Sequence, residues 1–210
     1  MKGLLFITHQ TEHITTLQSV AIALAGGCRH IQLRMKEATT DEVVQTAIRA
    51  QELCTNAQAN LYINDHPAIA AQVGAAGVHL GKSDMSPREA RRILPHGSII
   101  GGTANTFDDI LYLAAQGVDY IGLGPFRFTE TKSVLSPTLG IVGYHRLMCQ
   151  CQEHHIHLPL FAIGSITYED IPAVIAAGMS GVAISSAILR ATDPIAETKR
   201  IIHLLHTYTQ

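Results

Sequence analysis

Charged, amide and hydroxyl side chains stand one or two residues past the ends of short apolar segments in this sequence. Carboxylate oxygens are ligands for divalent metal ions, and cations beside hydrogen-bond donors stabilise phosphate esters. The sequence therefore indicates a site for a divalent metal and a highly charged phosphate ester. The residues that carry this prediction are Gln32, Arg34, Lys36, Asn64, Asp65, Asp84, Thr129, Thr131 and Lys132.

The elements that must position these residues alternate along the chain. Apolar residues between positions 43 and 54 recur at i, i+3, i+4 and i+7, which is the spacing of an amphipathic helix. Similar segments separate short β-branched runs. These runs predict eight strands, at 4–8, 30–34, 61–65, 77–81, 99–103, 120–124, 160–164 and 182–186.

Eight strand–helix units with strands apolar on both faces predict an α/β fold, a (β/α)8 TIM barrel that forms a single domain over residues 1–210. A doubly wound open sheet is the alternative, but no Gly-x-Gly-x-x-Gly motif follows the first strand. In a barrel the carboxyl ends of all strands converge on one face. The polar residues above are therefore expected to lie together.

Several helix boundaries can be predicted from local signals. Thr39 followed by Glu42, and Ser86 followed by Glu89, have the pattern of capping boxes. Asp193 precedes a proline that opens the last helix. Glycines after alanine-rich segments predict helix stops directly before strands, at Gly77, Gly117 and Gly178.

Incidental roles are the alternatives for the charged residues. Capping does not explain Arg34 and Lys36, because cations are unfavourable near a helix N-terminus, so ion pairing with nearby acids is their alternative role. Asp65 could instead support a turn before the next helix. Asp84 lies two residues before a predicted cap and is not needed for capping.

Two further regions are candidates for ligand binding. Residues 125–140 form the longest segment without a regular pattern, and we expect this segment, which contains Arg127, to cover the site; disorder is the alternative. Gly164-Ser165 and Ser185-Ser186 follow the last two predicted strands, where many barrels bind phosphate. A plain turn is the alternative at these glycine and serine positions.

Composition narrows the class of protein. Of 210 residues, 47% are hydrophobic, so a large core is expected. The formal net charge is −2, so we expect no positively charged surface that would bind nucleic acid or a membrane. The first residues have too short an apolar run for a signal peptide, and no run of about 18 apolar residues could span a bilayer, so we expect a cytoplasmic protein with free thiols. The sequence does not determine the oligomeric state, and a homo-oligomer is possible.

One cysteine- and histidine-rich segment is expected to be a helix end and surface loop rather than a zinc site. Its residues are Cys149, Cys151, His154, His155 and His157.

With these residues placed, the chain resembles the thiamine phosphate synthase family over nearly its whole length. The motifs that carry the resemblance are Gln32-Leu33-Arg34-Met35-Lys36, Ile63-Asn64-Asp65, Gly77-Val78-His79-Leu80-Gly81-Lys82-Ser83-Asp84, Ile121-Gly122-Leu123-Gly124-Pro125, Thr129-Glu130-Thr131-Lys132 and Ala162-Ile163-Gly164. The resemblance implies a barrel enzyme with small-molecule substrates. It would join hydroxymethylpyrimidine diphosphate to hydroxyethylthiazole phosphate with Mg²⁺, giving thiamine phosphate and pyrophosphate.

The resemblance also implies a role for each matching residue. The diphosphate would be held by Arg34, Lys36, Asn64 and Lys132, of which the three cations would be catalytic. Mg²⁺ would be bound by Asp65 and Asp84. The pyrimidine would face Gln32, Asn64 and Thr103. The thiazole phosphate would be bound by Thr129, Thr131, Gly164 and Ser186.

The chain departs from the family pattern at a few positions. Ser165 replaces a frequent glycine, Asn105 replaces a common histidine, and Arg127 adds a cation that could meet phosphate. The alternative functions are a thiazole tautomerase on the same barrel, a non-catalytic barrel that binds thiamine precursors, and a barrel acting on another phosphorylated substrate. The two aspartates and the diphosphate-binding cations argue against the first two.

Overall fold

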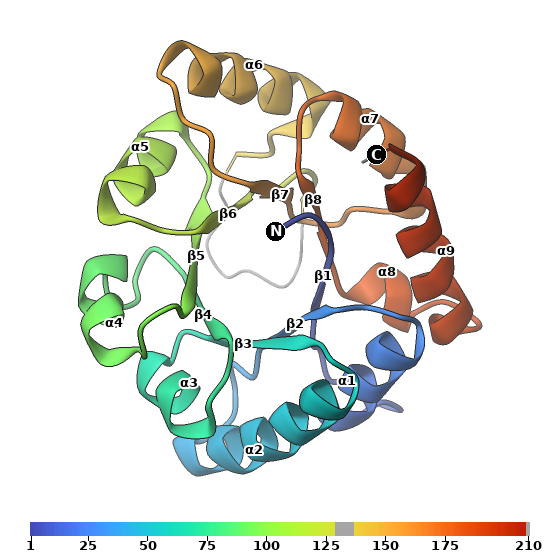
Figure 1. Cartoon of the computed structure of the whole chain (residues 1–210). Coiled ribbons are helices and arrows are strands. Elements are labelled where there is room, and N and C mark those ends of the chain that lie inside the picture. The colour runs from blue at the N-terminus through green and yellow to red at the C-terminus, as the bar shows by residue number, and fades with distance from the viewer. Residues whose placement is uncertain (129–136, 209–210) are drawn as a thin grey trace.

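The barrel predicted from the sequence is confirmed in a computed structural model of the chain, which describes residues 1–128 and 137–208. Eight parallel strands form a closed barrel in sequence order, and each hydrogen-bonds to the next (Figure 1). The strands are β1 (Gly3–Ile7), β2 (His30–Leu33), β3 (Asn60–Asn64), β4 (Gly77–Leu80), β5 (Ile99–Ala104), β6 (Tyr120–Leu123), β7 (Leu160–Ala162) and β8 (Gly181–Ile184).

Helices surround the barrel and cover the outer face of its strands (Figure 1). They are α1 (Thr16–Ala25), α2 (Thr40–Asn56), α3 (Pro67–Val73), α4 (Pro87–Ile93), α5 (Phe107–Gln116), α6 (Gly140–Glu153), the 3₁₀ turn η1 (Tyr168–Asp170), α7 (Ile171–Ala176), α8 (Ser186–Leu189) and α9 (Pro194–Tyr208). The short helix α8 starts where the sequence predicted the end of the last strand. No helix in these two described ranges combines the length and apolar character needed to cross a bilayer.

Most predicted helix boundaries are confirmed. Thr39 and Ser86 close capping boxes with their glutamates, and the Asp193 carboxylate accepts hydrogen bonds from the first turn of α9. The predicted stop at Gly77 is wrong, because Gly77 is the first residue of β4. Helix α3 ends at Gly74 instead, which adopts the left-handed φ of 66° that glycine tolerates best.

The barrel interior is filled by rings for which glycines leave room. Tyr62, Tyr120 and Phe161 are fully buried there, and Tyr120 makes edge contacts with both of the other rings. A Cβ on Gly101 of the neighbouring strand would lie 2.2 Å from Tyr120 Cζ. The interior is therefore a packed core, and ligands must bind above it, at the strand ends.

Candidate active site

A carboxylate pair lies past the carboxyl ends of β3 and β4. Lys36 Nζ is 2.9 Å from Asp65 Oδ2, and the Gly81 backbone N–H donates to Asp84 Oδ2 at 2.6 Å. Asp65 and Asp84 also hydrogen-bond to each other through their side chains. With Asn64 they line a cavity of about 430 Å³. Four predicted site residues, Lys36, Asn64, Asp65 and Asp84, therefore meet at one cavity.

The pKa values of the two aspartates are shifted in opposite directions. Burial, together with the hydrogen bond to Asp65, raises the pKa of Asp84. Burial also acts to raise the pKa of Asp65, but the hydrogen bonds to Asp84 and Lys36 outweigh it and hold that pKa below its ordinary value. Two carboxylates in contact cannot both ionise easily unless a cation lies between them. The pair therefore suits a divalent cation that supplies the missing charge.

The structure bears on the alternative roles of these residues. Asp65 has a left-handed φ of 67°, which fits the turn that was its alternative role, while its carboxylate also pairs with Lys36. Lys36 pairs with Asp65 across two loops rather than with an acid of its own segment. Ser86, not Asp84, caps α4. Lys36 does form an ion pair, but its partner, Asp65, is itself a predicted site residue.

Beside this cavity, buried polar side chains connect neighbouring strands. Gln32 Nε2 donates to Asn64 Oδ1 at 2.6 Å, and both residues are buried. The Thr103 hydroxyl hydrogen-bonds to His79 Nε2 at 2.9 Å, and His79 Nδ1 is 3.0 Å from the Tyr120 hydroxyl. Gln32, Asn64 and Thr103, which could face a heterocyclic ring, are thus held in place by hydrogen bonds to one another and to residues of the barrel interior.

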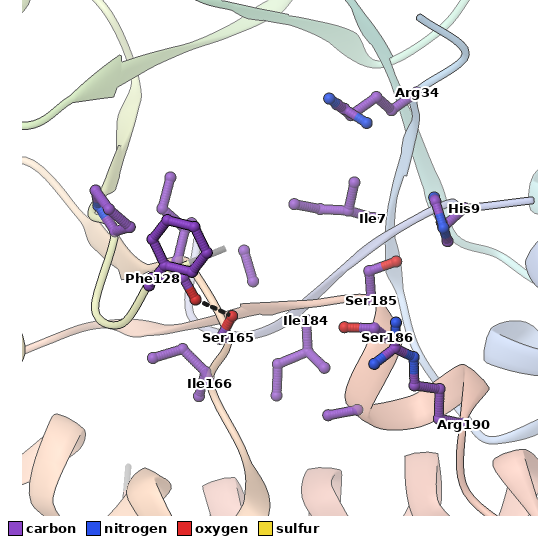
Figure 2. A pocket seen from close by; sticks show the side chains of 15 residues that line it. Ile7, His9, Arg34, Phe128, Ser165, Ile166, Ile184, Ser185, Ser186 and Arg190 are labelled. Carbon is purple, nitrogen blue, oxygen red and sulfur yellow. Dashed lines mark hydrogen bonds between the residues drawn. The ribbon is translucent and has the colours of Figure 1, made fainter. Parts of the chain in front are cut away.

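A second cavity, of about 380 Å³, lies past the ends of β7 and β8 (Figure 2). Gly164 and Ser165 in its wall have consecutive left-handed φ values of 95° and 53°. Their backbone N–H groups, and that of Ile166, donate no hydrogen bond within residues 1–128 and 137–208. Successive unpaired N–H groups form a concave site for an anion. Gly164 and Ser186, both predicted to bind phosphate, line this cavity.

Arg34 lies in the wall of the second cavity rather than beside the carboxylate pair (Figure 2). It also lines a neighbouring cavity that contains Lys36. Burial lowers the pKa of Arg34 despite the nearby Asp65 and Glu37, and its guanidinium forms no ion pair with any described residue. A partly buried cation without a partner is suited to an anionic ligand.

Arg127, the added cation that could meet phosphate, has partners within the protein. Its guanidinium binds both carboxylate oxygens of Asp170 and donates to the Ser165 carbonyl at 3.2 Å. The Ser165 hydroxyl donates to the Phe128 carbonyl at 3.0 Å, drawn as a dashed line in Figure 2. Arg127 and Ser165, two residues at which the chain departs from the family pattern, therefore connect the loop after β6 to the loop after β7. Asn105 also points inward and donates to the Gly124 carbonyl.

Three predicted site residues, Thr129, Thr131 and Lys132, lie outside the described residues. The segment rich in cysteine and histidine ends α6, and no group of three or more metal-ligating side chains occurs in the part of the chain that is described. Arg190, which was not among the predicted site residues, also lines the second cavity. Its position four residues after Ser186 was the available signal.

The fold and the two cavities define a (β/α)8 barrel whose candidate active site lies at the carboxyl ends of its strands. A family model described as thiamine monophosphate synthase matches residues 4–188, and this chain belongs to that family. The thiamine-phosphate synthase of Phocaeicola vulgatus is 54% identical over 199 residues, which are 95% of this chain and 96% of that protein.

Further relatives agree in sequence and in structure. The thiamine-phosphate synthase of Bacteroides fragilis is 51% identical over 204 residues, covering 97% of this chain and all of that protein. The solved structure of thiamine phosphate pyrophosphorylase from Pyrococcus furiosus superposes with a TM-score of 0.85 at 27% identity. It covers 99% of this chain and 97% of that one. The similarity therefore spans the whole barrel.

Proposed function

We propose that this protein joins hydroxymethylpyrimidine diphosphate to hydroxyethylthiazole phosphate, releasing pyrophosphate and forming thiamine phosphate. The observation that carries the proposal is the presence of two separate anion sites on one barrel face. One has the carboxylate pair and Lys36, as a metal-bound diphosphate requires. The other has backbone N–H groups that no described residue accepts from, which suit a monophosphate. Family membership supports the same reaction.

In this reaction the bond between the pyrimidine methylene carbon and the diphosphate oxygen breaks, and the thiazole nitrogen forms a bond to that carbon. Both bonding electrons leave with the pyrophosphate, so negative charge develops on the leaving group. Lys36 and Arg34 are the described cations placed to stabilise it. We propose that Lys132 contributes in the same way, as the family motif implies.

Mg²⁺ fits the donor set at the first cavity. Asp65 and Asp84 offer two carboxylates in mutual contact, and Mg²⁺ characteristically takes one or two carboxylates with phosphate oxygens and water. When bound, the ion neutralises charge on the departing diphosphate. Lys36 then holds Asp65 in the orientation that the metal site needs.

The remaining predicted substrate-binding residues are assigned either to the pyrimidine or to the thiazole phosphate. We propose that Gln32, Asn64 and Thr103 face the pyrimidine, because the first two are buried against each other and Thr103 is fixed by His79. Gly164 and Ser186 bind the thiazole phosphate in the second cavity. Thr129 and Thr131 are assigned to the same phosphate from the family motif alone.

A coupled assay tests the proposal. The purified protein is incubated with both substrates and Mg²⁺, and thiamine phosphate and pyrophosphate are quantified by mass spectrometry. We expect the two products in equal amounts, and neither when one substrate or Mg²⁺ is omitted. Isomerisation of thiazole phosphate without the diphosphate substrate would favour a tautomerase, which is the competing function on this fold.

We also propose that the enzyme acts in the cytoplasm. Cys28, Cys54, Cys149 and Cys151 are all free thiols, and three of them are buried. Free thiols are typical of proteins from a reducing compartment. A fusion to a fluorescent protein, followed by fractionation of the cells, tests this assignment.

A further inference from the structure

The second cavity is strongly cationic in its described lining. Arg34, Arg190 and His9 are the titratable residues among the described side chains of its wall, and that wall includes no carboxylate. Ser185 and Ser186 lie between the two arginines in Figure 2. The Ser185 hydroxyl is buried and lacks a hydrogen-bond partner within the described residues. An unpaired hydroxyl and two cations around one cavity indicate a doubly charged anionic ligand.

Helical geometry directs Arg190 into this cavity. The Arg190 backbone N–H donates to the Ser186 carbonyl at 2.9 Å, so the two residues are one helical turn apart on the same face. Side chains of helical residues lean toward the N-terminus of their helix, which here is the end at the cavity. Figure 2 shows the Arg190 guanidinium extending toward Ser186.

The acids near Arg190 in sequence are occupied elsewhere. The Asp193 carboxylate accepts from the backbone of Ile195 and Ala196, and Glu197 pairs with Arg200. The Arg190 guanidinium has no hydrogen bond or ion pair with any residue in 1–128 or 137–208. Its charge is therefore available to a ligand.

Arg34 and Arg190 have different surroundings. Arg34 also lines the cavity that contains Lys36, so its charge is shared with the diphosphate side of the site. Arg190 lines only the second cavity among those described. On the basis of the proposed function, we propose that Arg190 is a specificity-determining residue that recognises the phosphate of the thiazole substrate. It would make the enzyme select the phosphorylated thiazole over the free alcohol.

Steady-state kinetics with Arg190→Gln test this role. We expect the KM for thiazole phosphate to rise roughly tenfold, as loss of a charge-assisted hydrogen bond at an exposed site implies, while the KM for the pyrimidine diphosphate stays unchanged. Competitive inhibition by inorganic phosphate against thiazole phosphate should weaken by a similar factor. Arg190→Lys should be intermediate, because lysine keeps the charge but not the two-point geometry.

Arg146→Gln is the matched control, because Arg146 is an exposed arginine of α6 outside the cavity and its loss changes the net charge equally. It should behave as the wild type. An unchanged KM for thiazole phosphate in Arg190→Gln, or an equal rise for both substrates, would overturn the role of Arg190. If the wild type forms no thiamine phosphate, the proposed function fails. A thermal-shift titration with inorganic phosphate, comparing wild type and Arg190→Gln, then still decides whether Arg190 binds phosphate.

Discussion

Asp65 and Asp84 hydrogen-bond to each other although they come from loops after different strands. Asp84 has the raised pKa of the pair and Asp65 the lowered one, so the contact between the two carboxyls opposes ionisation mainly at Asp84. A divalent ion binds the ionised form of both groups, so metal binding at this site is expected to strengthen as the pH rises.

Asp84→Asn should raise the Mg²⁺ concentration needed for half-maximal activity several-fold. The amide keeps the oxygen that accepts from Gly81, but it removes one of the two charges that attract the metal. Titration of activity with Mg²⁺ measures the effect. The melting temperature without metal should not fall, because the variant no longer has a like-charge pair.

Asp108→Asn is the control for this experiment, because Asp108 is an exposed residue of α5 with the same change of charge. Its Mg²⁺ requirement should equal that of the wild type. An Asp84→Asn protein with wild-type activity and wild-type Mg²⁺ dependence would show that the carboxylate is only a loop residue.

Lys36→Gln should lower kcat by roughly 100-fold, because it removes a cation from the charge that develops on the leaving group. The loss also frees Asp65, whose only described ion pair is with Lys36. Single-turnover measurements of pyrophosphate release test this prediction. Lys199→Gln, an exposed lysine on α9, should retain full activity. Equal rates in both variants would exclude Lys36 from the reaction.

The ion pair between Arg127 and Asp170 should make stability depend on pH. Burial acts to raise the pKa of Asp170, but hydrogen bonds from Arg127 and Thr167 hold it below the ordinary value of 3.8. A carboxyl with a lowered pKa in the folded state stabilises the protein above its unfolded pKa, and this contribution disappears as the pH falls through the folded pKa.

We therefore expect Asp170→Asn to be less stable than the wild type by about 1 kcal/mol at pH 7, a modest value because Arg127 is half exposed. The difference should shrink below about pH 4 and vanish in stronger acid. Urea unfolding between pH 7 and pH 2.5 measures it. A difference that is constant over this range would mean that the ionised carboxylate is not its source.

Ser165 offers a comparison between backbone strain and a hydrogen bond. Its φ of 53° is costly for residues other than glycine, and its hydroxyl donates to the Phe128 carbonyl. Ser165→Ala loses the hydrogen bond and keeps the strain, whereas Ser165→Gly loses both. Ser165→Gly should therefore be more stable than Ser165→Ala by about 1 kcal/mol in urea unfolding. The reverse order would show that this φ carries no strain.

The fold was predictable because its signals are local. β-Branched segments, capping boxes and glycine stops each occupy a few residues, and eight repeats of the same unit leave few possible topologies. The wrong stop at Gly77 shows the limit of such signals. Gly74 and Gly77 follow similar segments, and only the backbone reveals which of them adopts the left-handed conformation.

The site was predictable as a location and only partly as a set of contacts. A barrel brings all strand ends to one face, so the grouping of Lys36 with Asp65 followed from topology. The pairing of Arg127 with Asp170 did not follow from topology, because the two residues are 43 positions apart in the sequence. Whether Arg127 contacts Asp170 or a phosphate depends on side-chain distances that the sequence does not give. For the same reason, the position of Arg34 in the walls of two cavities could not be predicted from its strand.

Gly101 and Tyr120 restrict the paths that evolution can follow in this barrel. Enlarging Gly101 while Tyr120 is present forces a Cβ to 2.2 Å from the ring, whereas shrinking Tyr120 first leaves an empty space and removes the hydroxyl that contacts His79. Each single change is harmful, and only the double change restores packing. Descendants of this sequence are therefore expected to keep both residues or to replace them together.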